Sequence, residues 1–543
     1  MQLSRRRLIK AGLGAAAGAA GVAGVSVFAP RSTFASPAMR EHYPAIVIGS
    51  GYGGGVSALR LAQAGIETLI IEKGRLWDTP DADGKRFSKM LPPDTRAGWF
   101  TSHPPSLVRS YQGVSIDAVA EHVPSPQPIQ AGICERVPLG SHTVFRGIAV
   151  GGGSLVNAGI AAIPTREQVE AAFPDLNATE FLEKYIPLAA QTLRISHRDM
   201  DWFEQTPCFQ YARVGRKYAA AAGYDVDYNG SSYSFDYLRD EVAGLVPPSA
   251  TAFEQQYGNN FGRSGSVDQT YIAQALGTGH AKLMPLTEVT DIRRERSGTY
   301  VVSTREIDRW GKEIHRREVG CEQLYLAAGV LGTVKLLLRA RETGTLPELN
   351  DEIGRGYGNN GDVMVAHNLN SDDPAGTEQS LLGLINLDGR QDEQNPVYAS
   401  MFSIPLPVET HTLGYYVMVR TGDRVDIRYD AKTDSATIEW TNAHNDHIFD
   451  RAKMVFDKLL QANGVDYRTD LFDGQIFAPS TVHPLGGCVR GRATDMFGRV
   501  MGYDKLYVND SSLIPGYIGC NPFMTITALA ERNIESILKG RTG

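Results

Sequence analysis

The sequence has few cysteines, and none of them forms a paired CxxC motif. There are five in 543 residues. Structural zinc and iron–sulfur sites need such paired ligands, so we expect no metal site. Free cysteine is among the most buried residue types, and we expect each one to be a small buried side chain. The five are Cys134, Cys208, Cys321, Cys488 and Cys520.

Basic residues are not in excess either. Lys and Arg number 54 against 61 Asp and Glu, the formal net charge is −7, and no dense basic stripe follows residue 10. This balance argues against a nucleic-acid partner. The length is too great for one compact core, so we expect two domains that interleave along the chain.

Residues 1–38 have the pattern of an export signal. Twin arginines at Arg5 and Arg6 precede an apolar stretch, 11–29, that is rich in Ala and Gly, and a cleavage-like segment follows at 33–35. A transmembrane helix is the alternative, because the stretch is nearly long enough to span a membrane. Ala and Gly are only weakly hydrophobic, which favours a Tat-type signal. We therefore expect a secreted or periplasmic protein that is exported already folded.

A glycine-rich motif opens the rest of the chain. The apolar run 45–48 is of strand length, residues 49–54 read GxGxxG, and a helical pattern covers 54–64. A second apolar strand, 68–71, ends at Glu72. Strand, glycines, helix, strand and acid in this order are typical of a Rossmann-type dinucleotide site.

Each position in this motif has a physical role. Gly49 permits the tight turn, Gly51 lets a pyrophosphate approach the backbone, and Gly54 lets the helix pack closely against the strand. The helix N-terminus offers free N–H groups to the phosphates. Glu72 is placed to accept hydrogen bonds from the adenosine ribose.

The motif by itself does not separate NAD from FAD, and two later segments favour FAD. Residues 145–160 read FRGIAVGGGSLVNAGI, in which the glycines allow close approach of a flat ligand and Asn157 offers an amide. Strands expected at 288–290, 300–304 and 324–328 end in small residues that again allow close approach. Three separate segments would thus meet one long dinucleotide.

The C-terminal quarter carries the candidate catalytic residues. His483 lies in STVHPLGG and precedes a proline, so its backbone is expected to be extended. Residues 507–510 read as a short strand that ends in Asp510. Asn521 precedes a helix with an apolar stripe from 526 to 537, and the positive end of that helix favours negative charge.

These segments resemble the glucose–methanol–choline (GMC) oxidoreductases, and within them the bacterial cholesterol oxidases that bind FAD non-covalently. The resemblance covers essentially the whole chain after the export signal. The segments that carry it are IGSGYGGGVSALRLAQAG at 48–65, GGGSLVNAGIA at 151–161, GNNGDVM at 358–364, HPLGG at 483–487, VNDSSLIPG at 508–516 and NPFMTITALAERN at 521–533.

The resemblance implies roles for single residues. His483 would hydrogen-bond the substrate hydroxyl and help to remove its proton, and Asn521 would orient the substrate. Together with the motif analysis, the residues expected to hold FAD are Gly49, Gly51, Tyr52, Gly53, Gly54, Glu72, Gly151, Gly152, Ser154, Asn157, Val289, Asp510, Asn521, Pro522 and Phe523.

The implied fold is α/β (α+β), with a Rossmann-type FAD-binding domain and a discontinuous substrate-binding domain that contains a mixed β-sheet. We expect the FAD domain to comprise 40–82, 140–160, 265–360 and 470–543, and the substrate domain 83–139, 161–264 and 361–469.

The implied reaction is FAD-dependent oxidation of a secondary alcohol to a ketone, with oxygen reduced to hydrogen peroxide. A 3β-hydroxysteroid or another bulky apolar alcohol is the expected substrate. We expect a monomer that makes transient contact with a membrane surface. An enzyme that modifies a non-steroid natural product, and a flavin-binding protein with altered catalysis, stay open as alternatives.

The sequence departs from the resemblance at Ser400. Cholesterol oxidases carry a glutamate there, which moves a steroid ring proton when the double bond shifts. A serine hydroxyl is a poor base without a partner. We therefore expect weak or no steroid isomerisation. Asp362 is the alternative carboxylate, although the sequence does not show whether it reaches the substrate.

Overall fold

The computed structural model describes residues 40–90, 93–102, 110–111, 114–115, 128–378, 385–402, 404 and 408–540. The export signal predicted for 1–38 lies outside these ranges. All of the helices and strands in the described ranges belong to one unit, Glu41–Gly543.

The apolar run before the glycine motif forms strand β1 (Glu41–Ile48), which lies inside a seven-stranded sheet. It pairs in parallel with β2 (Thr68–Ile71) on one side and with β13 (Glu313–Leu326) on the other. The strand order is β10-β2-β1-β13-β12-β11, and β22 (Leu506–Val508) also pairs with β13. Strands buried on both faces read as continuous apolar runs, as β1 and β2 do.

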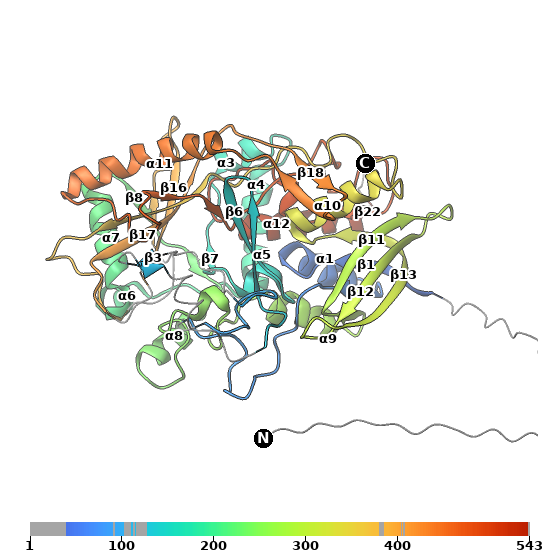
Figure 1. Cartoon of the computed structure of the whole chain (residues 1–543), viewed down its shortest axis with the longest axis horizontal. Helices are drawn as coiled ribbons and strands as arrows, with labels where there is room; N and C mark the ends of the chain where they lie inside the picture. The colour runs from blue at the N-terminus through green and yellow to red at the C-terminus, as the bar shows by residue number, and fades with distance from the viewer. Residues whose placement is uncertain are drawn as a thin grey trace, which may run out of the picture. The chain divides into compact units, whose positions relative to one another are not determined.

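Helix α1 (Tyr52–Gln63) follows the glycine motif as predicted. It ends where Gly65 takes a left-handed φ of 75°, a conformation that glycine adopts without strain. Its buried face packs against α12 (Phe523–Leu538), which in turn packs against α5 (Ile186–Thr192). The N- and C-terminal parts of the unit thus form one layer over the sheet (Figure 1).

The strands predicted around 288, 300 and 324 are confirmed as β11 (Thr287–Arg294), β12 (Tyr300–Ile307) and β13. They pair antiparallel as a meander on one side of the parallel strands. The seven-stranded sheet is therefore mixed.

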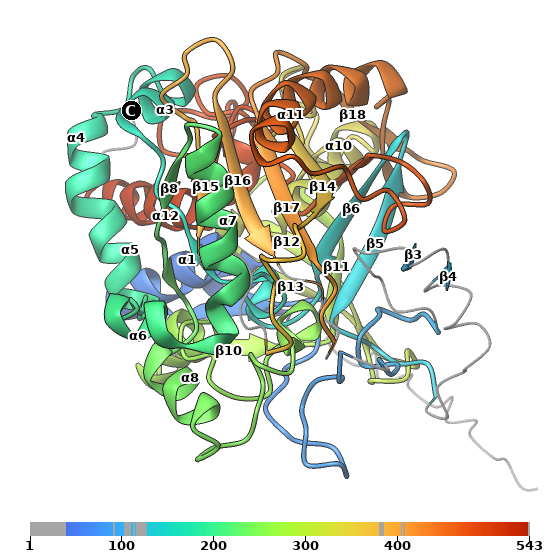
Figure 2. The same ribbon diagram turned by 90° about the vertical axis from the view of Figure 1, so that its left-hand side faces the viewer.

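A second sheet has six strands in the order β20-β14-β17-β16-β15-β8. The resemblance implies a mixed sheet in this part, but every pairing is antiparallel, because its central strands are joined without helical crossovers. Its strands are β8 (Asp225–Asp227), β14 (Asp362–Asn368), β15 (Asn386–Asp388), β16 (Val397–Phe402), β17 (Thr412–Val419) and β20 (Phe477–Ala478). Helices α7 (Gln210–Ala221) and α11 (Asn442–Asn463) pack on it (Figures 1 and 2).

A hairpin of β5 (Cys134–Leu139) and β6 (His142–Gly147) lies between the two sheets (Figure 1). Strand β21 (Ser480–Thr481) pairs in parallel with β6. This pairing brings the segment before His483 beside the chain that leads into the second glycine cluster.

The remaining elements are β3 (Ser110–Tyr111), β4 (Val114–Ser115), η1 (Gly152–Leu155), β7 (Ile160–Ala161), α3 (Arg166–Ala172), α4 (Ala178–Glu180), η2 (Phe181–Tyr185), α6 (Met200–Gln205), η3 (Pro207–Phe209), β9 (Gly230–Ser231), α8 (Phe235–Val242), η4 (Glu254–Tyr257), η5 (Asp268–Ile272), α9 (Ala273–Gly277), β10 (Ala281–Met284), α10 (Gly329–Glu342), β18 (Ile427–Asp430), β19 (Ser435–Ile438) and η6 (Ser511–Leu513). None of the helices in the described ranges combines the length and apolar character that a membrane span needs. The five cysteines are free and buried, as predicted.

A buried ion pair joins α1 to α12. Arg60 donates from Nε and Nη2 to the two carboxylate oxygens of Glu531, each at 2.7 Å, and the hydroxyl of Tyr271 donates to the same carboxylate at 2.8 Å. The Glu531 side chain is only 2% exposed. Three elements that are distant in sequence therefore share one carboxylate.

We expect E531A to lower the free energy of unfolding by about 3 kcal/mol, because it leaves a part-buried guanidinium and a buried phenol without their acceptor. Equilibrium unfolding in urea measures this change. The matched control is E204A, which breaks the solvent-exposed Arg216–Glu204 pair and should cost less than about 1 kcal/mol. Equal losses in the two variants would contradict a special role for the buried pair.

Candidate active site

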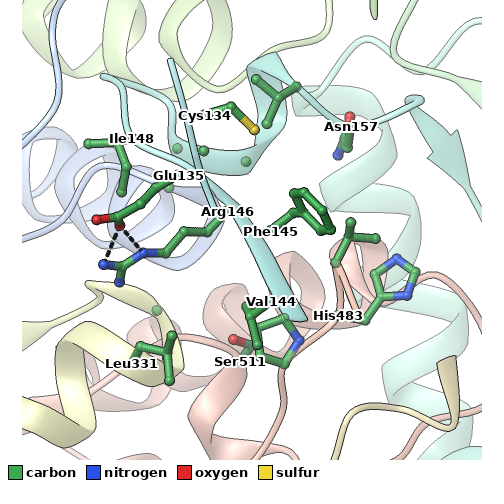
Figure 3. A pocket seen from close by; sticks show the side chains of 18 of the residues that line it. Cys134, Glu135, Val144, Phe145, Arg146, Ile148, Asn157, Leu331, His483 and Ser511 are labelled. Carbon is green, nitrogen blue, oxygen red and sulfur yellow. Dashed lines mark hydrogen bonds and ion pairs between the residues drawn. The ribbon is translucent and has the colours of Figure 1, made fainter. Parts of the chain in front are cut away.

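A cavity of about 740 Å³ is lined by residues of both sheets and of the β5–β6 hairpin. Figure 3 shows His483 and Asn157 on one side of it, and Glu135 with Arg146 on the other. The glycine motif and His483, which are far apart in sequence, therefore border the same space.

The glycine motif forms one wall. Gly49 has a left-handed φ of 94°, and a Cβ there would lie 2.3 Å from the carbonyl oxygen of Ala327. A Cβ on Gly51 would meet no atom within 4 Å. The backbone at Gly51 is thus bare toward the cavity at the N-terminus of α1, which suits the approach of a pyrophosphate.

Glu72 also lines the cavity, at the end of β2. Its carboxylate accepts hydrogen bonds from the backbone N–H and hydroxyl of Ser50 at 2.9 and 2.7 Å, and from the N–H of Gly74 at 2.8 Å. Burial raises the pKa of Glu72, while these hydrogen bonds oppose the rise. Ser50 was not singled out in the sequence, yet its hydroxyl also accepts from the N–H of Gly151 at 3.0 Å and so joins the two glycine clusters.

Beyond Glu72 the cavity has a charged end. Val289 lines it together with Lys73 and Glu288. Arg146 Nε donates to Glu135 Oε2 at 2.6 Å across the hairpin (Figure 3). Among the described residues, no group of three or more His, Cys, Asp or Glu forms a metal site at this end or elsewhere.

Some of the residues predicted to hold FAD form hydrogen bonds within the chain that shape the cavity wall. Asp510 lines it, but its oxygens accept from Gly329 N, Thr333 Oγ1 and the N–H and hydroxyl of Ser512. It therefore anchors the N-terminus of α10, and burial raises its pKa. Gly54, Gly151 and Ser154 are not among the lining residues. Ser154 instead bonds Gly151 O and Val267 N and so shapes the loop.

The part of the cavity near Asn157 is built on aromatic rings. Tyr52 stacks on Phe523 with centroids 5.0 Å apart and 12° between the planes. The Tyr52 hydroxyl accepts from Asn157 Nδ2 at 2.7 Å. Burial raises the pKa of Tyr52 to about 12, so the phenol stays neutral. Tyr52, Gly53, Gly152, Asn157, Pro522 and Phe523 all line the cavity.

His483 lines the cavity and is held from behind by Asp362. The distance from His483 Nδ1 to Asp362 Oδ1 is 3.1 Å, and the Asp362 side chain is fully buried. Because a carboxylate accepts hydrogen bonds, it holds the proton on Nδ1 and leaves Nε2 as the nitrogen available to the cavity.

Asp362 has two further partners. Its second oxygen accepts from the hydroxyl of Thr481 at 2.7 Å and from that of Tyr416 at 3.0 Å. Burial raises the pKa of Tyr416 well above its usual range, which keeps the phenol a donor. Asp362 is not among the lining residues, so the hypothesis that it replaces the missing glutamate as a substrate base is wrong. The carboxylate acts through His483.

Ser400 and Asn521 are brought together from β16 and the start of α12. The Ser400 hydroxyl donates to Asn521 Oδ1 at 3.2 Å, and both residues line the cavity. Since Oδ1 is engaged, the NH₂ group of Asn521 is the part left to face a ligand. Asn521 is 7% exposed, so its orientation is fixed by packing as well.

The cavity wall from the six-stranded sheet is apolar. The side chains of Met364, Phe402, Ile404 and Tyr416 form one cluster in this wall, and the Tyr416 ring contacts His483. The sequence did not predict the roles of Ser50, Tyr416 and Thr481. Their only sequence signal is a polar group within an apolar or glycine-rich segment, which says nothing about its partner.

The sequence matches family models and known proteins. The model for the C-terminal part of GMC oxidoreductases, described as "GMC oxidoreductase, C-terminal", covers residues 360–473, and a second, "GMC oxidoreductase", covers 420–530. The cholesterol oxidase of Mycobacterium tuberculosis is 24% identical over 91% of each chain. That of Acinetobacter baumannii is 23% identical over 91% of this chain and 94% of its own.

Solved structures share the fold. Pyridoxine 4-oxidase from Mesorbium loti superposes with a TM-score of 0.61 at 16% identity, over 92% of this chain and 99% of its own. A fungal aryl-alcohol oxidase gives 0.61 at 14% identity, over 93% and 100%. These matches show that residues 360–530 carry the C-terminal domains of GMC oxidoreductases and, together with the bare glycine wall and the residues around His483, that the chain is similar over most of its length to the FAD-dependent alcohol oxidoreductases of that family.

Proposed function

We propose that this protein oxidises a bulky, apolar secondary alcohol of the 3β-hydroxysteroid class to the ketone, with molecular oxygen as the acceptor. The observation that carries the proposal is the apolar wall of Met364, Phe402 and Ile404 beside His483. A large apolar substrate gains free energy there by burying its surface. The relatives named cholesterol oxidase support the same class of substrate.

In the proposed reaction, His483 removes the hydroxyl proton. Nε2 accepts a hydrogen bond from the substrate hydroxyl and then the proton itself, while Asp362 stabilises the resulting imidazolium. The NH₂ group of Asn521 orients the substrate oxygen. The glycine wall with Glu72 would hold FAD, which would supply the acceptor for the carbinol hydride and, with oxygen as the final acceptor, the route to hydrogen peroxide.

We further propose that a steroid ketone leaves without isomerisation. Moving a ring proton needs a base free to accept it, and the Ser400 hydroxyl is engaged with Asn521. The carboxylates that line the described cavity all interact with donors of the chain itself: Glu72, Glu135, Glu288, Asp434 and Asp510. No carboxylate among them is left for the substrate.

D362N is expected to lower kcat by about two to four orders of magnitude, with little change in KM or FAD content. An asparagine amide can donate to Nδ1, which places the ring proton on Nε2, where it blocks proton removal. Steady-state kinetics and the flavin spectrum measure both effects.

The matched control for D362N is D227N, because Asp227 also accepts from a tyrosine hydroxyl, that of Tyr398 at 2.9 Å, at the edge of the same sheet. D227N should retain the wild-type kcat. A D362N enzyme as fast as wild type would refute the role given to Asp362.

Anaerobic mixing of the holoenzyme with cholesterol is expected to bleach the flavin absorbance, and the product should keep its 5-ene bond. Smaller secondary alcohols should bleach it more slowly, because they bury less apolar surface. The S400E enzyme, which restores the carboxylate expected from the resemblance, should release some conjugated 4-ene ketone. Bleaching by small alcohols with none by cholesterol would exclude the sterol, and a 4-ene product from the wild type would contradict the proposal for Ser400.

We also propose that residues 1–38 direct Tat export. Replacement of Arg5 and Arg6 by lysine should retain the full-length protein inside the cell, since the twin arginines are the signal. Cell fractionation and the N-terminus of the exported chain test this. Export of the double variant at the wild-type level would rule it out.

A further inference from the structure

Arg263 is a buried cation behind the cavity wall, in the loop that precedes η5. It is 6% exposed. Among the described residues, no carboxylate lies within ion-pair distance of its guanidinium, and its Nε has no hydrogen-bond partner. Charged side chains are almost never fully buried unless they are paired, so an arginine in this state needs an explanation.

Every partner of the guanidinium in this part of the chain is neutral. Nη1 donates to the backbone oxygen of Asn157 at 2.7 Å and to Asn259 Oδ1 at 3.1 Å. Nη2 donates to Asn157 Oδ1 and, at 3.0 Å, to the hydroxyl of Ser232. Burial lowers the pKa of Arg263, but arginine remains protonated in proteins. The positive charge is therefore held in place by dipoles alone.

Asp268 is the acid whose charge acts on Arg263, and it does not neutralise it. The two side chains form no ion pair, and one oxygen of Asp268 has no partner among the described residues. Burial raises the pKa of Asp268, which favours its neutral form. Among the described residues, the guanidinium charge behind this wall is therefore not offset by an ion pair.

The guanidinium also fixes the amide of Asn157. Asn157 Oδ1 accepts from Arg263 and from the N–H of Gly159 at 3.0 Å, so Nδ2 must be the group that donates to Tyr52. Asn157, Tyr52 and Gly159 all line the cavity. A Cβ on Gly159 would lie 2.7 Å from the hydroxyl of Ser232, which accepts from Nη2, so the glycine makes room for this partner of the guanidinium. Asn157 thus lies between the Arg263 guanidinium and the cavity.

We propose that Arg263 is a positioning residue that fixes Asn157 and places positive charge behind the FAD cavity, and that it makes the reduction potential of the bound FAD more positive. Reduction adds negative charge to the cofactor, and a fixed positive charge in a region of low dielectric constant stabilises the reduced form more than the oxidised form. The inference rests on FAD binding and does not depend on which alcohol is the substrate.

The test is the midpoint potential of FAD in the holoprotein, measured by spectroelectrochemical titration without substrate. R263M should shift the potential to more negative values, and R263K should restore most of it because it keeps the charge. The affinity for sulfite, which forms an anionic adduct with flavin, should fall in R263M by tenfold or more. R213M is the matched control, because in the described part of the chain Arg213 also donates to neutral acceptors, Phe203 O at 2.6 Å and Thr206 O at 2.8 Å, and does not line the cavity.

A second variant keeps the proposal testable if R263M does not retain FAD. N157D is nearly isosteric and sets a carboxylate against Arg263, which neutralises its charge without removing it. It should also shift the potential to more negative values. A wild-type potential and sulfite affinity in both N157D and a folded, FAD-loaded R263M would show that Arg263 only stabilises the loop, and would overturn the proposal.

Discussion

The architecture depends on the close backbone approach around the first glycine motif. A Cβ on Gly53 would lie 1.6 Å from the carbonyl oxygen of Asn509, and one on Gly54 would lie 2.1 Å from that of Gly49. Because these positions lack side chains, α1 can start directly behind β1 and pack against the segment that follows β22. The same turn presents the bare backbone of Gly51 to the cavity. Packing of the Rossmann part and access for the pyrophosphate therefore have one cause.

A second principle recurs around the cavity. Three of the polar side chains that line it are each oriented by a buried partner: His483 by Asp362, Asn521 by Ser400 and Asn157 by Arg263. Asp362 and Arg263 are not among the lining residues, whereas Ser400 lines the cavity together with Asn521. An imidazole or an amide has two chemically different ends, and only a fixed partner decides which end a ligand meets. The partners are buried, so solvent does not compete for these hydrogen bonds. Preorganisation of this kind is what a site needs if its polar groups are to act without first reorganising.

The two sheets form chemically different parts of the cavity wall. The parallel strands bring glycines and helix N-termini to one side, where a dinucleotide gains hydrogen bonds from backbone groups. The antiparallel sheet supplies Met364, Phe402 and Ile404 on the other side, where an apolar molecule gains from the loss of water contact. His483 lies at the meeting point because β21 pairs with β6, between the sheets.

Elements whose signals are local could be predicted from the sequence. The order of strand, glycines, helix and acid from 45 to 72 predicted β1, α1 and β2. The segments 145–160 and 288–328 favoured FAD, and the HPLGG and NPF segments indicated the resemblance to GMC oxidoreductases. The hydrogen-bond partner of each of these cavity residues became apparent only in the folded structure. Asp362 and His483 are 121 residues apart, and Ser400 and Asn521 are also 121 apart. The tertiary structure also decided that the six-stranded sheet is antiparallel. Periodicity and motif spacing describe neighbours along the chain, whereas these pairings arise from packing between sheets, which no local pattern encodes.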